Sequence, residues 1–109
     1  MIRKIQIPFI DANIQEVTIT RWLCREGDVI RRKQPIAEMT TEKASFEFES
    51  PCAGTMRKIL APEKSIIPIG FIFAVIGDTE SPVPDFSKHN RLVIEKYRAK
   101  NDILPGNQG

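Results

Sequence analysis

Apolar and polar side chains alternate along most of the first 78 residues, in short runs separated by turn-forming residues. Alternation with a period of two is typical of half-buried β-strands. The pattern predicts strands over residues 2–7, 16–24, 29–30, 35–40, 44–49, 55–61, 66–67 and 71–76. Short strands at this spacing, with no helical pattern among them, predict an all-β fold, either an antiparallel sandwich or a flattened barrel.

The chain also contains an internal repeat. A shift of 37 residues matches Thr18 with Thr55, Ile19 with Met56, Leu23 with Leu60, Glu26 with Glu63, Val29 with Ile66, Ile36 with Phe73, Ala37 with Ala74 and Met39 with Ile76. Four of these pairs are identical, and apolar positions coincide throughout. The repeat predicts two similar four-stranded sheets about a pseudo-two-fold axis that share one core, an arrangement known as a barrel-sandwich hybrid.

Between two of the predicted strands, Thr41, Glu42 and Lys43 form a short polar segment that predicts a tight turn. A lysine at such a tip holds its ε-amine in water, where a modifying enzyme can join a carboxylic acid to it. The same lysine is also compatible with a plain solvated charge. Under the repeat, the turn corresponds to the segment around Glu80, so Lys43 is expected at one end of the domain and the outgoing chain at the other.

Residues 79–109 are expected to lie outside the β domain of residues 1–78. Ser81-Pro82-Val83-Pro84 resembles a linker, and Ser87 is a candidate N-cap for a short helix over about residues 87–100, with Val93 and Tyr97 on one face. Asn101 and Pro105-Gly106 are expected to end this helix. The sequence leaves open whether the tail packs on the β domain, contacts another chain or belongs to a longer protein.

Composition narrows the function classes. The chain has 109 residues, 41% of them hydrophobic and 28% charged, with a net charge of +2. Dispersed basic residues argue against a nucleic-acid surface, and the lack of a long apolar run argues against a membrane protein. Cys24 and Cys52 are isolated, which predicts buried or semi-buried thiols and no metal site. The N-terminus has a strand pattern without a signal-peptide core, so the expected location is a bacterial-type cytoplasm or an equivalent reducing compartment. No catalytic constellation is apparent.

Several motifs together resemble a known family. In order, they are Glu26-Gly27-Asp28-Val29, Pro35-Ile36-Ala37-Glu38, Thr41-Glu42-Lys43-Ala44, Ser50-Pro51-x-Ala53-Gly54, Ile69-Gly70 and Ala74-Val75-Ile76-Gly77. Their order and spacing resemble the lipoyl domains, in the biotinyl/lipoyl attachment family, of 2-oxoacid dehydrogenase dihydrolipoyl acyltransferase components. The resemblance covers roughly residues 1 to 78.

The resemblance implies a non-catalytic carrier with lipoate in amide linkage on Lys43, in a turn flanked by Thr41, Glu42 and Ala44. Biotin carriers usually place methionine on both sides of the lysine, so lipoate is preferred over biotin here. The implied partners are a lipoyl-attaching ligase or transferase, a thiamine-dependent decarboxylase, an acyltransferase core and a flavin dehydrogenase. Residues implied in partner recognition are Phe9, Ile10, Asp11 and Glu47.

The chain departs from the family pattern at four places. Glu42 replaces the usual aspartate before the lysine, Lys33 and the Glu63-Lys64-Ser65 turn replace glycine-containing turns, and the loop of residues 9–13 lacks the usual glycine. We therefore expect the turns at Lys33 and Lys64 to be strained or differently shaped. Two other functions remain open, namely an unmodified interaction or structural module of a larger protein and the biotin carrier domain of a carboxylase.

Overall fold

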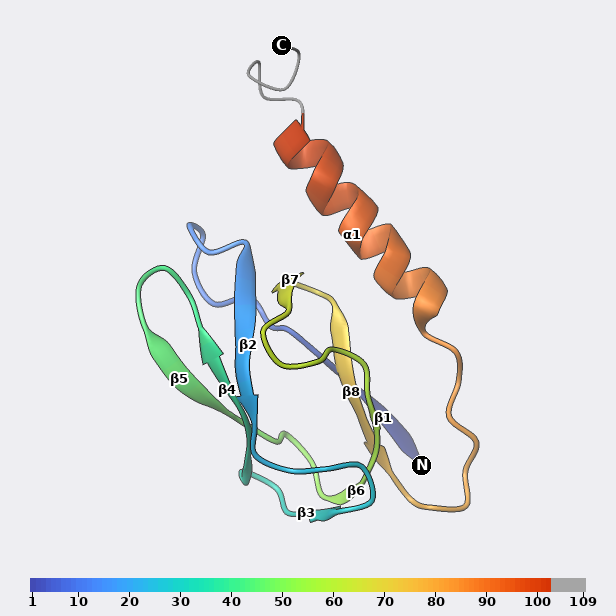
Figure 1. Ribbon diagram of the computed structural model, residues 1–109. Helices are drawn as coiled ribbons and strands as arrows, with labels where there is room; N and C mark the ends of the chain where they lie inside the picture. The colour runs from blue at the N-terminus through green and yellow to red at the C-terminus, as the bar shows by residue number, and fades with distance from the viewer. Residues whose placement is uncertain (103–109) are drawn as a thin grey trace.

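Two four-stranded antiparallel sheets form the body of the protein in the computed structural model, which describes the backbone of residues 1–102 and the side chains of residues 1–99 (Figure 1). The strands are β1 (Ile2–Gln6), β2 (Glu16–Trp22), β3 (Val29–Ile30), β4 (Pro35–Thr40), β5 (Ser45–Glu49), β6 (Gly54–Ile59), β7 (Ile66–Pro68) and β8 (Ile72–Gly77). One sheet has the order β1-β8-β6-β3 and the other β5-β4-β2-β7. Because the sheets do not close on each other, the sandwich is the form adopted.

The predicted repeat relates the two sheets residue by residue. In the β2–β4 pair, Thr18 lies opposite Thr40, and exactly 37 residues later Thr55 lies opposite Gly77 in the β6–β8 pair. Both ladders are interrupted at the corresponding place, directly after Ile19 and after Met56 respectively. The outer strands β1 and β5 pair with β8 and β4 in the same register. The internal two-fold similarity is therefore confirmed down to the irregularities of hydrogen bonding.

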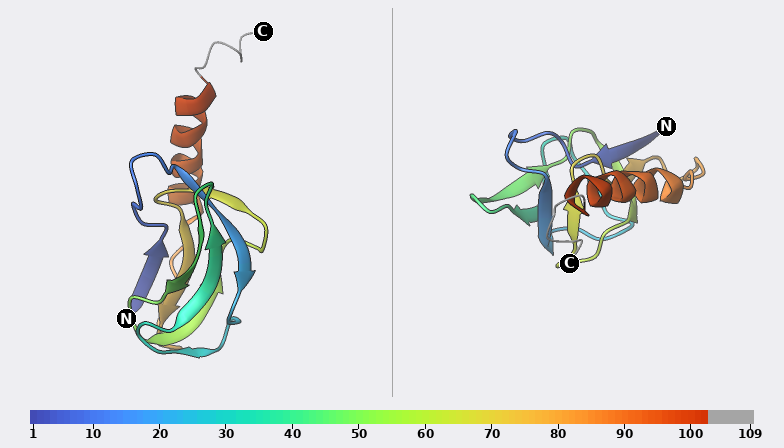
Figure 2. Two further views of the ribbon diagram at one scale, coloured as in Figure 1. Left: turned by 90° about the vertical axis from the view of Figure 1, so that its left-hand side faces the viewer. Right: turned by 90° about the horizontal axis from the view of Figure 1, so that it is seen from above.

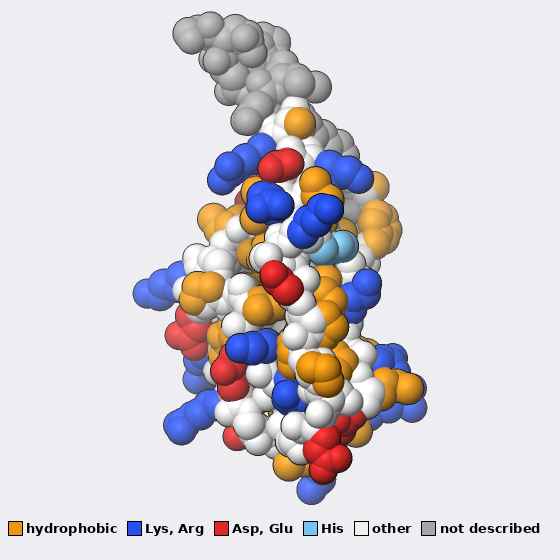
Figure 3. Space-filling view, turned by 90° about the vertical axis from the view of Figure 1, so that its right-hand side faces the viewer, with side chains coloured by type: hydrophobic (Ala, Val, Ile, Leu, Met, Phe, Trp, Pro, Cys, Tyr) orange, Lys and Arg blue, Asp and Glu red, His pale blue; other side chains and the backbone are white. Residues whose placement is uncertain are grey.

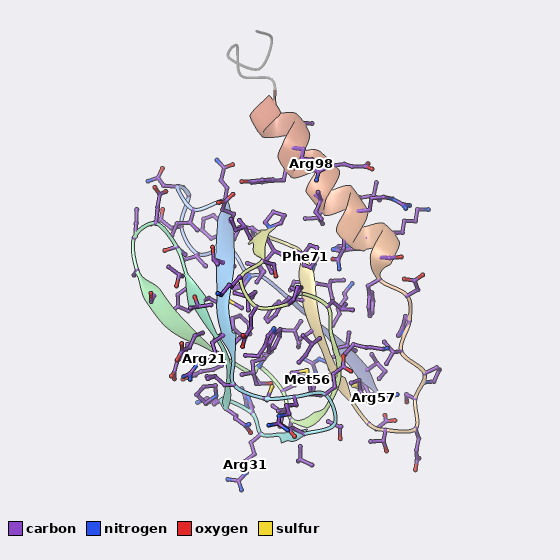
Figure 4. All side chains as sticks on the ribbon, in the orientation of Figure 1. Arg21, Arg31, Met56, Arg57, Phe71 and Arg98 are labelled. Carbon is purple, nitrogen blue, oxygen red and sulfur yellow. The ribbon has the colours of Figure 1, made fainter. Side chains whose placement is uncertain are left out.

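A single hydrophobic core lies between the sheets. Phe73 is fully buried at its centre, with its ring centroid 5.9 Å from that of Trp22 and 5.1 Å, edge to face, from that of Phe48. Ile36, which corresponds to Phe73 in the other half, is also fully buried, as is Met56, labelled between the sheets in Figure 4. Since Phe73 belongs to one sheet and both of its aromatic neighbours to the other, neither half has a core of its own.

Two pairs of turns need the left-handed backbone conformation. Gly27 has a φ of 96° and its counterpart Lys64 a φ of 73°, while Gly70 has a φ of 94° and its counterpart Lys33 a φ of 71°. Strain and a different shape were the two outcomes expected at Lys33 and Lys64. Both turns have the same left-handed backbone as their glycine counterparts, so they are strained. A side chain with a Cβ is unfavourable in this region of φ, whereas glycine is not.

The tail returns along the sandwich as a helix, α1 (Ser87–Asp102), which resolves one of the alternatives that the sequence left open. The chain leaves β8 at the end of the molecule opposite the β4–β5 hairpin, and α1 then runs back toward the hairpin end (Figures 1 and 2). Asn90, a buried residue, holds the helix to the sheet, because its side-chain amide accepts a hydrogen bond from Ile72 N (2.7 Å) and donates one to Ile72 O (2.9 Å).

The ends of α1 differ slightly from the prediction. Ser87 is itself helical, and the cap is provided by Asp85, whose carboxylate accepts a hydrogen bond of 2.9 Å from the Ser87 amide. The pKa of Asp85 is lowered by its hydrogen bonds with Ser87 and by Arg91. Asn101 continues the helix rather than ending it, and Pro105-Gly106 lies outside the described residues.

Cys24 and Cys52 are buried free thiols, as predicted. Burial, with a contribution from Asp28, raises the pKa of Cys24 to about 11, so this thiol is protonated and unreactive at neutral pH. In the described part of the chain, no helix has the length and hydrophobicity needed to cross a bilayer, and no three His, Cys, Asp or Glu side chains are grouped as metal ligands.

Candidate functional site

Lys43 lies in the turn that joins β4 to β5, as the alternating pattern predicted. The last strand pair is Thr40 opposite Ser45, and beyond it the Thr41 amide donates a hydrogen bond of 2.8 Å to the carbonyl of Ala44. The Thr41 hydroxyl also donates to Ala44 O, at 3.1 Å, and accepts from the amides of Lys43 and Ala44, at 3.2 Å each. Thr41 thus organises the turn from within and leaves the Glu42 and Lys43 side chains in solvent.

The ε-amine of Lys43 is accessible. Its side chain is 51% exposed, and among the residues that the structure describes it forms an ion pair with Asp11, whose Oδ2 lies 3.3 Å from Nζ. The Asp11 side chain is itself 40% exposed. Ion pairs between groups that remain in water are weak, so Asp11 does not prevent Lys43 from reaching another molecule.

Asp11 reaches Lys43 from the loop between β1 and β2. Its Oδ1 accepts a hydrogen bond of 2.9 Å from the Asn13 amide, which leaves Oδ2 turned to the lysine. The Asn13 hydrogen bond is the largest cause of the lowered pKa of Asp11, and Lys43 adds to it. The carboxylate is therefore charged at neutral pH.

The structure brings some of the predicted site residues together and leaves one apart. Phe9 and Ile10 lie in the same loop as Asp11, and they are 74% and 38% exposed, which is unusual for large apolar side chains. Glu42 and Ala44 flank Lys43 and are exposed. Glu47 lies farther along β5, opposite Glu38, which pairs with Arg21 on the outer face of the sheet (Figure 4). Glu47 therefore does not belong to the cluster around Lys43.

One part of the site was not predicted from the sequence. A hollow of about 360 Å³ lies between the β1–β2 loop, the end of β7 and α1, and Asp11 is among the residues that line it. The helix supplies Val93, Lys96 and Tyr97, and the Tyr97 hydroxyl donates a hydrogen bond to the Glu16 carboxylate. The spacing of Val93 and Tyr97 indicated a common helix face, but it carried no information on what that face covers.

Comparison with known proteins agrees with this geometry. Residues 3–76 match the model of the Biotin_lipoyl family, described as "Biotin-requiring enzyme". The dihydrolipoyllysine-residue acetyltransferase component of the pyruvate dehydrogenase complex of Corynebacterium glutamicum is 36% identical over 77 residues, which are 71% of this chain and 11% of that protein. The dihydrolipoyllysine-residue succinyltransferase component of the 2-oxoglutarate dehydrogenase complex of Rickettsia bellii is 32% identical over 78 residues, covering 72% of this chain and 20% of that protein.

A solved structure shows the same fold. The lipoyl domain of the 2-oxoglutarate dehydrogenase complex from Azotobacter vinelandii superposes with a TM-score of 0.58 at 22% identity, covering 72% of this chain and 98% of that domain. This chain spans a quarter or less of the length of the two curated relatives above. The similarity is therefore to one domain of each relative.

Proposed function

We propose, since this chain belongs to the Biotin_lipoyl family, that residues 1–78 form a carrier domain whose Lys43 bears a lipoyl group in amide linkage. The observation that carries this proposal is the position of the amine. A turn built by Thr41 holds it at the tip of a hairpin, half exposed and in contact with one weakly bound carboxylate. The residues present thus fit a covalently attached acyl group, because Nζ is free to form an amide and has room beyond it.

Lipoate is favoured over biotin by the residues next to the lysine and by the relatives. Glu42 and Ala44 occupy the positions where biotin carriers usually have methionine. The curated relatives cited above are named for dihydrolipoyllysine, and the solved structure is a lipoyl domain. Glu42 keeps the negative charge of the aspartate usual at this position, so we expect the attaching enzyme to accept the turn.

As a lipoyl carrier, the domain would move acyl groups and reducing equivalents between components of a 2-oxoacid dehydrogenase-type complex, without catalysis of its own. The lipoyl group supplies a disulfide that can be opened, acylated and closed again. The chain supplies the tether, which raises the local concentration of the group at each partner's active site. The partners in this proposal are a lipoyl-attaching enzyme, a thiamine-dependent decarboxylase, an acyltransferase core and a flavin dehydrogenase. Phe9, Ile10 and Asp11 are the residues that a partner would meet beside Lys43.

The test is the intact mass of the chain produced in a host supplied with lipoate. We expect a gain equal to one lipoyl group, lost completely in Lys43→Ala and retained in the control Lys64→Gly, which removes another exposed turn lysine. A gain equal to one biotin would identify a biotin carrier instead. An unmodified chain, in a host that lipoylates a known lipoyl domain, would favour an interaction module and contradict the proposal.

A further inference from the structure

The hollow beside the β1–β2 loop, here called the helix groove, is an apolar site that the carrier function does not explain. Its walls are formed by Phe9, Ile14, Pro68, Ile69, Val93 and Tyr97. Its volume of about 360 Å³ lies within the range of pockets that hold small ligands. Asp11, Gln15 and Lys96 also line it, but most of its lining is apolar, which favours an apolar ligand over a charged one.

The helix groove and Lys43 have one neighbour in common, Asp11. Asp11 is one of the residues that line the groove, and its carboxylate lies 3.3 Å from Lys43 Nζ. The attachment atom is therefore one side chain away from the groove. In Figure 1 the β4–β5 turn, the β1–β2 loop and the second half of α1 lie at the same end of the molecule.

A second hollow near the lysine is less suited to an apolar chain. It lies between the hairpin and the β1–β2 loop, and the residues that line it include Glu16, Thr18, Thr40, Thr41 and Glu42. Hydroxyl and carboxylate groups in this hollow are hydrated, and covering them with hydrocarbon costs free energy. Of these two hollows, the helix groove has the more apolar lining, so an alkyl chain on Lys43 would gain more by entering it.

Attachment of the group also changes the charge beside the groove. Amide formation removes the positive charge of Lys43, so the ion pair with Asp11 is lost. What replaces it is a hydrocarbon chain in water, whose burial is favourable. The modification itself therefore removes a weak ionic contact of the lysine and places a hydrocarbon chain near the groove.

Helix α1 forms one side of the helix groove. Val93, Lys96 and Tyr97 form one wall, and α1 is held in place by Asn90 and by His89, whose Nε2 lies 3.1 Å from Gly70 O. Hydrophobic and basic side chains lie side by side on the face that carries α1 (Figure 3). Without the helix, the hollow would lose this wall.

We propose that the helix groove is the resting site of the acyl chain carried by Lys43 of the same molecule. The proposal rests on the carrier function proposed above and adds to it that the appended helix shields the arm between encounters with partner enzymes. The arm exchanges between the groove and solvent, so that it remains available for transfer.

The test compares the lipoylated and unmodified forms of the whole chain, after intact mass has established how much lipoyl group is attached. We expect lipoylation to shift the backbone amide NMR signals of Ile69, Val93 and Tyr97 as well as those of the turn. In Ala12→Trp, which fills the groove from an exposed loop position, the groove shifts should vanish. Leu92→Asp, a matched control at a helix position outside the groove, should retain them.

A second measurement reports on shielding directly. We expect a water-soluble phosphine to open the dithiolane about tenfold more slowly in the wild-type chain than in Ala12→Trp. Tenfold corresponds to about 1.4 kcal/mol, as expected when roughly two methylene groups leave water. Shifts confined to the turn, with equal opening rates in both chains, would overturn the proposal. Groove shifts that grow with protein concentration would identify a second copy's arm as the occupant and overturn it too.

The groove can be tested even where no lipoyl group becomes attached, an outcome that would contradict the carrier function alone. The Lys43→Cys chain, labelled with an octyl thiosulfonate, presents an alkyl chain at the same position without any attaching enzyme. Cys24 and Cys52 are buried, and the mass shows that one label has entered. Shifts at Ile69, Val93 and Tyr97 would support the groove as an alkyl site, and their absence would reject it.

Discussion

The two ends of the sandwich are built on the same framework and have opposite properties. At one end the segment from Thr40 to Ala44 turns back as a hairpin. At the other end the corresponding segment, Gly77 to Ser81, leaves the sheet and becomes the linker to α1. The strand pairs that lead into the two segments are in identical register, so the difference begins only after the last paired residue.

The charged groups at the two ends are held very differently. Asp78, at the exit, contacts the amine of Met1 and accepts hydrogen bonds from the amides of Glu80, at 3.0 Å, and Ser81, at 2.7 Å, and from the Ser81 hydroxyl. The Met1 and Ser81 contacts hold the pKa of Asp78 well below its usual range. Lys43, at the hairpin, has one exposed carboxylate beside it. One framework thus produces two kinds of end: a closed end, where several contacts hold the charged group, and an open end, where Lys43 has one such contact.

The largest effect expected is on the core that joins the two halves. Phe73→Ala should lower the free energy of unfolding by about 3–5 kcal/mol, because it removes a fully buried ring that contacts both sheets. Its counterpart Ile36→Ala should cost about 2–5 kcal/mol. Urea unfolding followed by tryptophan fluorescence and circular dichroism should give coincident single transitions in both variants. Separate transitions for the two probes would mean that the halves have independent cores.

A smaller effect should distinguish the two ends. Gly77→Ala would place a Cβ 2.4 Å from the carbonyl oxygen of Met1 and 3.0 Å from the Cα of Ile2, so β1 must move. We expect a loss of about 1–3 kcal/mol, typical of overpacking. The counterpart Thr40→Ala loses only the hydroxyl contacts with Thr20 and Ser45, at a partly exposed position. It should lower the free energy of unfolding by about 1 kcal/mol or less. Thermal denaturation of the two variants side by side measures the difference, and equal losses would contradict the closed-end interpretation.

Exchanging a residue with its counterpart in the other half should raise stability slightly. Lys64→Gly gives the strained turn the residue found at Gly27, and Lys33→Gly gives the other strained turn the residue found at Gly70. Each should stabilise by at most about 1 kcal/mol, since relief of the left-handed strain is partly offset by the greater freedom of glycine in the unfolded chain. Gly27→Ala, which introduces the strain, is the opposite control. Chemical denaturation would contradict the prediction if both glycine variants lost stability.

The parts of this structure that sequence could predict are those set by local alternation and by the repeat. Because strand residues alternate between the core and solvent, a one-residue error of register would expose residues such as Ile19 and Met56, and the strand positions follow from that constraint. The free thiols and the hairpin turn at Lys43 were predictable for the same kind of local reason. Strand ends were less certain, as at β6, which stops at Ile59 rather than at Ala61.

The parts that could not be predicted depend on contacts between distant segments. The helix itself follows from its pattern, but its docking depends on Asn90 meeting the backbone of Ile72, and no local signal marks that pair. Asp11 was singled out as a residue near a partner, whereas its contact with Lys43 depends on how the β1–β2 loop folds. The helix groove needs both of these, so it became visible only in three dimensions.

The smallest effect expected is on the pKa of Asp11, and it separates the contribution of Asn13 from that of Lys43. The pKa of Asp11 is lowered in the folded chain, so its interactions add stability above the ordinary aspartate pKa of about 3.9, and this stability is lost as the pH falls through the lowered value. Acylation of Lys43 removes only the lysine contribution. The pKa should then rise but remain below its ordinary value, because the Asn13 amide, the largest single cause, is still hydrogen-bonded. NMR titration of the Asp11 carboxyl carbon before and after modification measures this shift, and Asp78, at the closed end, provides a control that should not change.

An unchanged pKa of Asp11 would show that the ion pair with Lys43 does not persist in solution. The open end would then differ from the closed end even more than the structure indicates.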